Sequence, residues 1–202
     1  MTEKRYAIQQ TDEMNPSLAS PVWDDVPRAV LSVHRWKKYT PPPATEAQLL
    51  RCPSGFSVRM HTNERALRAE CTEQNGKIHE DSCMGFFFMP DPSDGRYLNF
   101  ELNPLGVLHL GIGENRKGRV HLDTDRSIFC IESQAREGDW TLKFYVPDAF
   151  LLSHYQRVAR ECRGNFYKCG DCTDHPHFGT WCEVETPMPD FHQSAFFGTM
   201  AW

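Results

Sequence analysis

Short segments of alternating apolar and polar residues, separated by turn-forming residues, dominate this chain. Residues 56–61 alternate in this way, and Leu98, Phe100 and Leu102 would share one face of a later segment. An alternation with period two is typical of a β-strand buried on one side. Pro, Gly, Asp and Asn clusters mark turns between the segments. The pattern predicts an all-β chain, and strands in such number favour a β-sandwich.

The remaining elements follow from similar patterns. Further strands are expected at 84–89, 107–112, 128–131 and 140–146. Only residues 148–160, directly after Pro147, have a spacing that predicts a helix. The chain shows no internal repeat, and its one low-complexity patch, Pro41-Pro42-Pro43, is too short for an interdomain linker. We therefore expect a single domain over residues 1–202.

Bulk composition excludes several classes of function. The formal net charge is −5, which gives no basic surface for nucleic acid. No apolar run is long enough to span a membrane. The N-terminus, Met1 to Tyr6, lacks the apolar core and the cleavage site of a signal peptide. We expect a cytoplasmic protein, or a secreted one whose export signal is absent from this sequence.

The chain contains eight cysteines, spread along its length. A protein of this size does not need disulfides to fold. The sequence also lacks a signal peptide that would direct it to an oxidising compartment. We expect free thiols, several of them packed as small apolar residues.

Polar side chains alternate with the apolar ones in the segment 97–103. If Leu98 faces the core, then Tyr97, Asn99 and Glu101 point the other way. Amides donate and accept hydrogen bonds and carboxylates accept them, which suits a polyhydroxylated ligand. A solvated sheet face, or a polar network between strands, explains the same pattern.

The segment 165–181 is denser in such groups. Asn165, Tyr167 and Cys169 would share one strand face, opposite Phe166 and Lys168, with a turn at Gly170-Asp171. Tyr167 and Trp181 are rings that can stack on a sugar. Lys168, Asp171 and His177 can bind its hydroxyls. In the alternative interpretation Trp181 belongs to the core and Asp171 caps the turn.

Metal sites are weakly indicated, and we expect no cofactor. The candidate zinc ligands are Cys169, Cys172, His175, His177 and Cys182. Their spacing is not that of a zinc knuckle or ribbon. The candidate calcium ligands are Asp91, Asp94, Asp123 and Asp125, in expected loops. Calcium stays open, although solvated loop acids explain these residues equally.

No catalytic motif stands out. The chain has no nucleophile elbow, phosphate loop or dinucleotide fingerprint. Glu70, Glu73, Glu80 and Asp81 could supply the carboxylate pair of a glycoside hydrolase. Cys83 and His79 could act as nucleophile and base, but nothing singles them out.

Four motifs carry a family resemblance. They are Asp81-Ser82-Cys83, the run from Tyr97 to Gly106, the run from Asn165 to Asp171, and Pro189-Asp190-Phe191-His192. Together they resemble the family 9 carbohydrate-binding modules, in their stand-alone family-9-like subgroup. The resemblance extends from about Tyr6 to Trp202. One departure is Gly85, at a position where the family pattern has Glu.

The resemblance implies a jelly-roll-like antiparallel β-sandwich that binds a glycan or oligosaccharide without catalysis. In this family aromatic residues clamp the sugar, calcium is sometimes bound, and modules are often attached to xylanases and other enzymes of carbohydrate catabolism. A glycoside hydrolase and a haem- or metal-binding sandwich are the alternatives. The residues expected to bind are Tyr97, Asn99, Glu101, Tyr167, Lys168, Asp171, His177 and Trp181. The sequence does not indicate the sugar or the oligomeric state.

Overall fold

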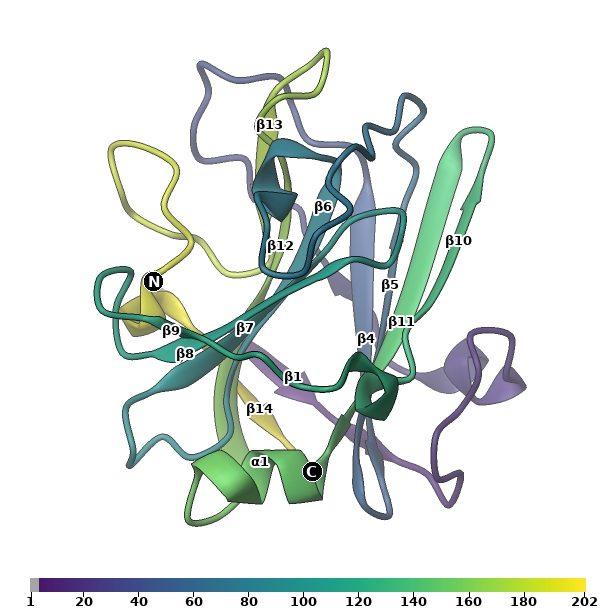
Figure 1. The fold of residues 1–202 in the computed structure, drawn as a ribbon, viewed down its shortest axis with the longest axis vertical. Coiled ribbons are helices and arrows are strands. Elements are labelled where there is room, and N and C mark those ends of the chain that lie inside the picture. Colours follow the sequence, from purple (N-terminus) through teal and green to yellow (C-terminus); the bar gives the residue numbers. More distant parts are fainter. Residues whose placement is uncertain (1–3) are drawn as a thin grey trace.

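The computed structural model describes residues 4–202, which form two β-sheets packed face to face (Figure 1). The larger sheet contains, in spatial order, β1 (Arg5–Ala7), β14 (Gly198–Ala201), β12 (Glu161–Gly170), β6 (Cys83–Met89), β7 (Tyr97–Leu102), β8 (Leu108–Gly113) and β9 (Val120–His121), with β13 (His177–Thr180) also paired to β12. The smaller sheet contains β10 (Glu132–Arg136), β11 (Asp139–Pro147), β5 (Gly55–Thr62), β4 (Thr45–Cys52) and β2 (Gln9–Gln10), with β3 (Ala29–Val30) paired to β4.

Most strand pairs are antiparallel, as the turn-rich sequence predicts. The two exceptions involve the N-terminal strands: β1 runs parallel to β14, and β2 runs parallel to β4. The N-terminal segment therefore contributes a strand to each sheet, and its β1 lies beside the last strand of the chain.

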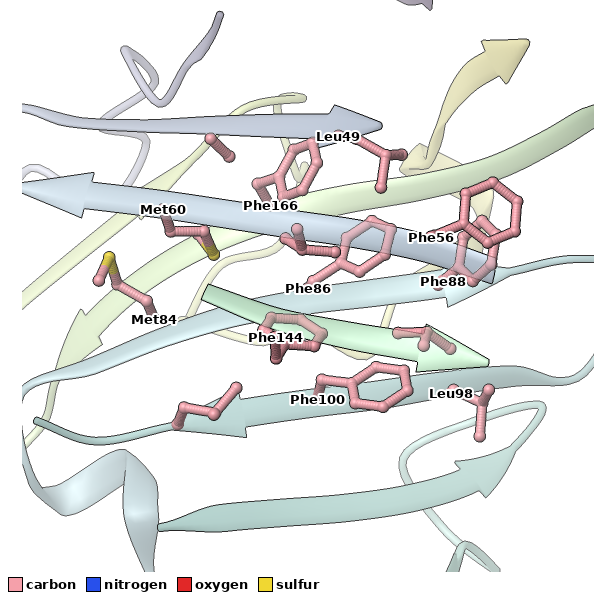
Figure 2. Close-up of a cluster of buried hydrophobic side chains, with 14 of the residues drawn as sticks. Leu49, Phe56, Met60, Met84, Phe86, Phe88, Leu98, Phe100, Phe144 and Phe166 are labelled. Atoms are coloured by element: carbon pink, nitrogen blue, oxygen red, sulfur yellow. The ribbon is translucent and has the colours of Figure 1, made fainter. Parts of the chain in front are cut away.

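The main core lies between the sheets and contains the apolar half of each alternating segment. Phe86 stacks on Phe166 within the larger sheet, with ring centroids 4.8 Å apart. Across the sheets, Phe100 stacks on Phe144 at 5.3 Å (Figure 2). Full burial of such a side chain stabilises the fold by about 1.5–3 kcal/mol. The expectation that Leu98, Phe100 and Leu102 face the core is confirmed.

The outer face of the larger sheet is covered as well. Tyr97, Phe87 and Tyr167 point to this side and are at most 1% exposed. The cover comes from irregular chain that contributes Trp36, Val184 and Phe197 to the same apolar cluster. A second, smaller core therefore lies on the outside of the sandwich, and the candidate site borders it.

Two expected elements differ from the structure. Residues 128–131 are not a strand: the 3₁₀ helix η3 (Arg126–Phe129) lies here, because Asp125 caps the Ser127 N–H and Cys130 adopts a left-handed φ of 44°. The helix after Pro147 is α1 (Asp148–His154), and it ends early because Tyr155 is extended. The other 3₁₀ helices are η1 (Pro21–Asp25), η2 (Ile78–Glu80) and η4 (Ser194–Phe196).

A helix long and apolar enough to cross a membrane does not occur in residues 4–202.

Candidate functional site

A cavity of about 370 Å³ opens on the outer face of the larger sheet. Its floor comes from strands β6, β7, β8, β9, β12 and β13, and its walls come from η2, the β8–β9 turn and the segment 189–192. The side chains that line it are His79, Phe87, Glu101, His109, Arg116, Arg119, His121, Cys169, Asp171, Phe178, Pro189, Asp190, Phe191 and His192.

Strand register explains why these residues meet. His109, Glu101, Gly85 and Tyr167 are consecutive partners across β8, β7, β6 and β12, so they form one row across the sheet. Side chains in such a row point to the same face, because register pairs residues of equal orientation. Four distant segments of the sequence are thereby brought under one opening.

Three carboxylates line the cavity: Glu101, Asp171 and Asp190. Asp190 pairs with Arg116 and accepts a hydrogen bond from Gln193. Glu101 accepts a hydrogen bond at Oε1 from the Asn99 side-chain amide at 2.9 Å, which fixes its direction. Asp171 follows the end of β12, and its Oδ1 is buried without a hydrogen-bond partner among the described residues. Burial raises the pKa of Asp171, and nearby His79 opposes this rise. An unpaired buried acceptor is costly, so a ligand hydroxyl that donates to Asp171 would gain more than it would in water.

Tyr97 and Asn99 lie beneath the cavity as a supporting layer. Asn99 is 1% exposed, and its Oδ1 accepts hydrogen bonds from Arg119 Nη2 and Nε at 2.6 and 3.0 Å. The Arg119 guanidinium also lies over the Tyr97 ring, 4.2 Å from its centroid. The Tyr97 hydroxyl is hydrogen-bonded to His192 Nδ1 at 3.0 Å. These residues orient Glu101, Arg119 and His192 rather than line the opening themselves.

Tyr167 supports one wall. Its ring stacks on Phe191 at 4.3 Å with an interplanar angle of 16°, and its hydroxyl donates to the Phe191 carbonyl at 3.1 Å. Phe191 lines the cavity, as does Phe178 of β13. Tyr167 is 1% exposed, so the ring available for contact with a ligand on this side is Phe191.

Lys168 and His177 belong to a separate cluster. Lys168 points to the same side of β12 as Phe166, and its Nζ lies 2.8 Å from Glu64 Oε2 and 3.0 Å from His177 Nε2. Burial and the neighbouring Lys168 charge lower the pKa of His177 to about 4. The cluster borders a different cavity of about 380 Å³, whose walls include Glu64 and His177. Strand alternation therefore separates Lys168 from Tyr167 and Cys169.

Trp181 lies in the core between the sheets, on the face of the larger sheet opposite the first cavity. Its ring meets Tyr6 edge-on at 6.2 Å and Phe166 at 6.0 Å. Of the eight residues expected to form one site, the structure brings Glu101 and Asp171 to the cavity, with Tyr97, Asn99 and Tyr167 directly behind it. Lys168, His177 and Trp181 lie elsewhere, so the structure does not bring all eight together.

Several cavity residues were not expected. Arg119, His109 and His121 come from segments without a ligand-binding motif. Burial, reinforced by the Arg119 charge, lowers the pKa of His192 to about 3. The sequence did point to the segment from Pro189 to His192, because it is one of the four motifs of the resemblance and all four of its residues line the cavity.

Three of the four candidate calcium ligands, Asp91, Asp94 and Asp125, have hydrogen-bond partners in the protein. Asp91 is bonded to Ser93 and Arg157, which lowers its pKa to about 2, and Asp94 pairs with Arg96. Asp81 accepts hydrogen bonds from the backbone of Glu70 and Cys71 and from Asn103. Among residues 4–202, no group of three or more His, Cys, Asp or Glu side chains is arranged to hold a metal ion.

Solved structures with the same fold are similar to this chain over nearly its whole length. A candidate carbohydrate-binding protein from Bacteroides uniformis has 27% sequence identity and a TM-score of 0.88, over 98% of this chain and 99% of that one. A family 9 module from Caldicellulosiruptor kristjanssonii in complex with glucose has 8% identity and a TM-score of 0.70, over 98% of this chain and 95% of that one. The cellotriose complex of a family 9 module from the same organism has 8% identity and a TM-score of 0.66, over 98% and 93% of the two chains.

The two Caldicellulosiruptor comparisons, at 8% identity, establish the β-sandwich fold alone. No curated protein sequence matches this chain. The sequence profile of carbohydrate-binding family 9 matches residues 22–202, which is most of the chain. The chain therefore belongs to carbohydrate-binding family 9.

Proposed function

We propose that the cavity above Glu101 and Asp171 binds a short sugar unit, either free or at the end of a glycan. The observation that carries this proposal is the unpartnered Oδ1 of Asp171 in a cavity that also has ring surface from Phe178 and Phe191. A sugar presents hydroxyls that donate hydrogen bonds and a C–H face that packs on rings. The volume of about 370 Å³ is at the lower end for small-ligand sites, which favours one or two sugar rings over a long chain.

Family membership supports the same ligand class. Family 9 modules from Caldicellulosiruptor kristjanssonii were solved with glucose and with cellotriose, so these two sugars are the first ligands to test. Ring contact here would come from Phe191 and Phe178 rather than from Trp181. Gly85 leaves the floor open between Glu101 and Tyr167, where the family pattern has a Glu side chain.

Binding without catalysis fits the remaining acids. Asp81 is 1% exposed and bonded to backbone N–H groups, while Glu70 pairs with Arg68 and Glu80 with Lys77. These carboxylates have structural partners and lie outside the cavity, so they are not placed on opposite sides of a sugar bound there, as the pair of a hydrolase would be. The conclusion is a carbohydrate-binding module whose ligand is held by hydrogen bonds and ring contact.

Calorimetry with glucose, cellotriose and a panel of xylan and mannan oligosaccharides tests the proposal. Glu101→Gln and Asp171→Asn each remove a charged acceptor and should weaken binding about 10- to 100-fold. Glu137→Gln and Asp24→Asn are matched controls, since both residues are exposed and lie outside the cavity. Unchanged affinity in both cavity variants would refute the site. Release of reducing sugar that is lost in the same variants would refute non-catalytic binding.

A further inference from the structure

Cys83 and Cys169 lie directly opposite each other on neighbouring strands. The register of β6 and β12 pairs them, and both side chains point to the outer face of the larger sheet. They are 1% and 4% exposed, and the strand register places them directly side by side. Cys169 also lines the cavity, so one sulfur of the pair can be reached through the opening.

Backbone hydrogen bonds define the geometry of this pair. The N–H of Trp181 donates to the carbonyl of Phe166, so the even-numbered residues of β12 direct their backbone groups toward β13. The odd-numbered residues, including Cys169, then direct theirs toward β6. Cys83 and Cys169 are thus a hydrogen-bonded antiparallel pair, for which Cα atoms lie about 5.5 Å apart.

That separation is within the range of disulfides, whose Cα atoms are commonly about 5.5–6 Å apart. The Cβ atoms of facing residues lie roughly 5 Å apart and must approach by about 1 Å to reach disulfide geometry. A movement of this size is within the reach of two strands that are already in register. We propose that Cys83 and Cys169 are a modification site: under oxidising conditions they form a disulfide that joins β6 to β12 beneath the cavity.

Three other cysteines have different surroundings. Cys162 lies in the core between the sheets and donates its S–H to the Met200 carbonyl. Cys130 is exposed, and its thiol contacts the Ser127 carbonyl. Cys172 is exposed and follows Cys169 by three residues, so it is the competitor that an experiment must exclude. It lies beyond the end of β12, where strand pairing no longer holds it opposite Cys169.

The oxidant we assign is a low-molecular-weight disulfide, which reacts by exchange. The Cys169 thiolate attacks one sulfur of the oxidant, forms a mixed disulfide and displaces one small thiolate. The Cys83 thiolate then attacks Cys169 Sγ and displaces the second. One S–S bond forms in the protein and one breaks in the oxidant. The two protein thiols lose two electrons and two protons, and two small thiols result.

Hydrogen bonding to Cys83 and burial raise the pKa of Cys169 well above its ordinary value. Since only the thiolate reacts, exchange should be slow near neutral pH and should accelerate between pH 7 and pH 9. The finished disulfide could be reached only through the cavity, where Cys169 is 4% exposed, so its reduction by exchange should also be slow. The site is therefore a stable cross-link rather than a rapid sensor.

Oxidised glutathione and the reduced full-length chain test this proposal. After incubation at pH 8.5, free thiols are blocked in denaturant, and the digested protein is analysed by mass spectrometry without reduction. We expect a cross-linked peptide pair that contains Cys83 and Cys169, and a loss of two titratable thiols per chain. Closure of this long loop should raise Tm by about 5–10 °C, and reduction in denaturant should reverse the change.

Two variants give the matched comparison. Cys83→Ser should abolish both the cross-link and the rise in Tm, whereas Cys172→Ser should preserve both. If Cys83→Ser does not fold, the peptide map of the wild-type chain still decides the assignment. Blocking of both Cys83 and Cys169 after oxidation would overturn the proposal, and so would a cross-link between Cys169 and Cys172. None of these readouts involves a glycan, so they stand apart from the test of sugar binding.

Discussion

Replacement of Trp181 by Ala separates a core role from a ligand-binding role. The indole is 5% exposed and is surrounded by Tyr6 and Phe166. It also lies against the backbone of Gly198 so closely that a Cβ placed there would be 2.7 Å from the indole Cζ3. These neighbours are strand residues and cannot collapse into the space that the ring leaves. We therefore expect Trp181→Ala to destabilise the fold and to leave the sugar site intact.

The magnitude follows from the loss of a large buried ring. Truncation of a buried Trp to Ala costs about 3–5 kcal/mol, and the rigid surroundings place this site toward the upper end. For a chain of this size each kcal/mol lowers Tm by about 2–4 °C. The expected decrease is roughly 6–20 °C, with little change in affinity for the folded fraction.

Thermal unfolding and calorimetry on the same preparations measure both quantities. Phe191→Ala is the matched variant, because its ring lines the cavity and stacks on Tyr167. It should weaken sugar binding about tenfold or more, with a smaller decrease in Tm. The reasoning fails if Trp181→Ala keeps the parent Tm, or if its folded form loses the ligand while Phe191→Ala retains it.

Three further outcomes are expected. The pKa values of His177 and His192 are about 4 and 3 in the folded chain, against about 6.5 when unfolded. The unfolded chain then binds more protons below pH 6.5, so stability falls as the pH falls. At pH 5 each histidine lowers the free energy of unfolding by up to roughly 2 kcal/mol relative to neutral pH. The denaturant midpoint should therefore be lower at pH 5 than at pH 7.5, and this difference should be smaller in His177→Gln. Asp81→Ala leaves three donors without their acceptor and should cost about 3–5 kcal/mol in chemical denaturation, whereas Glu70→Ala should change little. Gly85→Ala should be tolerated, since its Cβ would lie 3.6 Å from its nearest neighbours, whereas Gly164→Ala should lower Tm because its Cβ would lie 2.7 Å from the Phe87 carbonyl oxygen.

Strand alternation was sufficient to predict which side chains share a face. It placed Tyr97, Asn99 and Glu101 together, and it placed Tyr167 with Cys169. The β-sandwich follows from the same pattern. Register is what the sequence leaves open, and register decides that Gly85 lies between Glu101 and Tyr167. The row of residues that forms the floor of the cavity could not be predicted, because alternation within one strand does not show which residues pair with it on the next.

The outer cover of the sheet was the least predictable part. It comes from irregular segments around Trp36 and Phe191, which have no hydrophobic period to reveal which face they bury. This cover turns Tyr97 and Tyr167 from exposed rings into a buried supporting layer. Lys168 was expected at the ligand site, but it lies in the separate cluster with Glu64 and His177, for a related reason. Its partner Glu64 is distant in sequence, and an ion pair between such residues leaves no local pattern.

Asn99 shows how the buried layer determines the chemistry of the opening. Its Oδ1 accepts from Arg119 while its Nδ2 donates to Glu101, so a single side chain must offer an acceptor and a donor in opposite directions. A carboxylate at this position would repel Glu101, and an apolar side chain would remove the side-chain acceptor of Arg119, which also donates to the carbonyls of Tyr97 and Gly111, so an amide suits both neighbours. The neighbouring strand leaves room for this amide: Gly111 lies opposite Asn99, and a Cβ there would be 2.8 Å from the Asn99 Oδ1. Gly111 in β8 therefore supports the site indirectly, because it leaves space for the Asn99 amide, whose hydrogen bond orients Glu101 toward the proposed ligand.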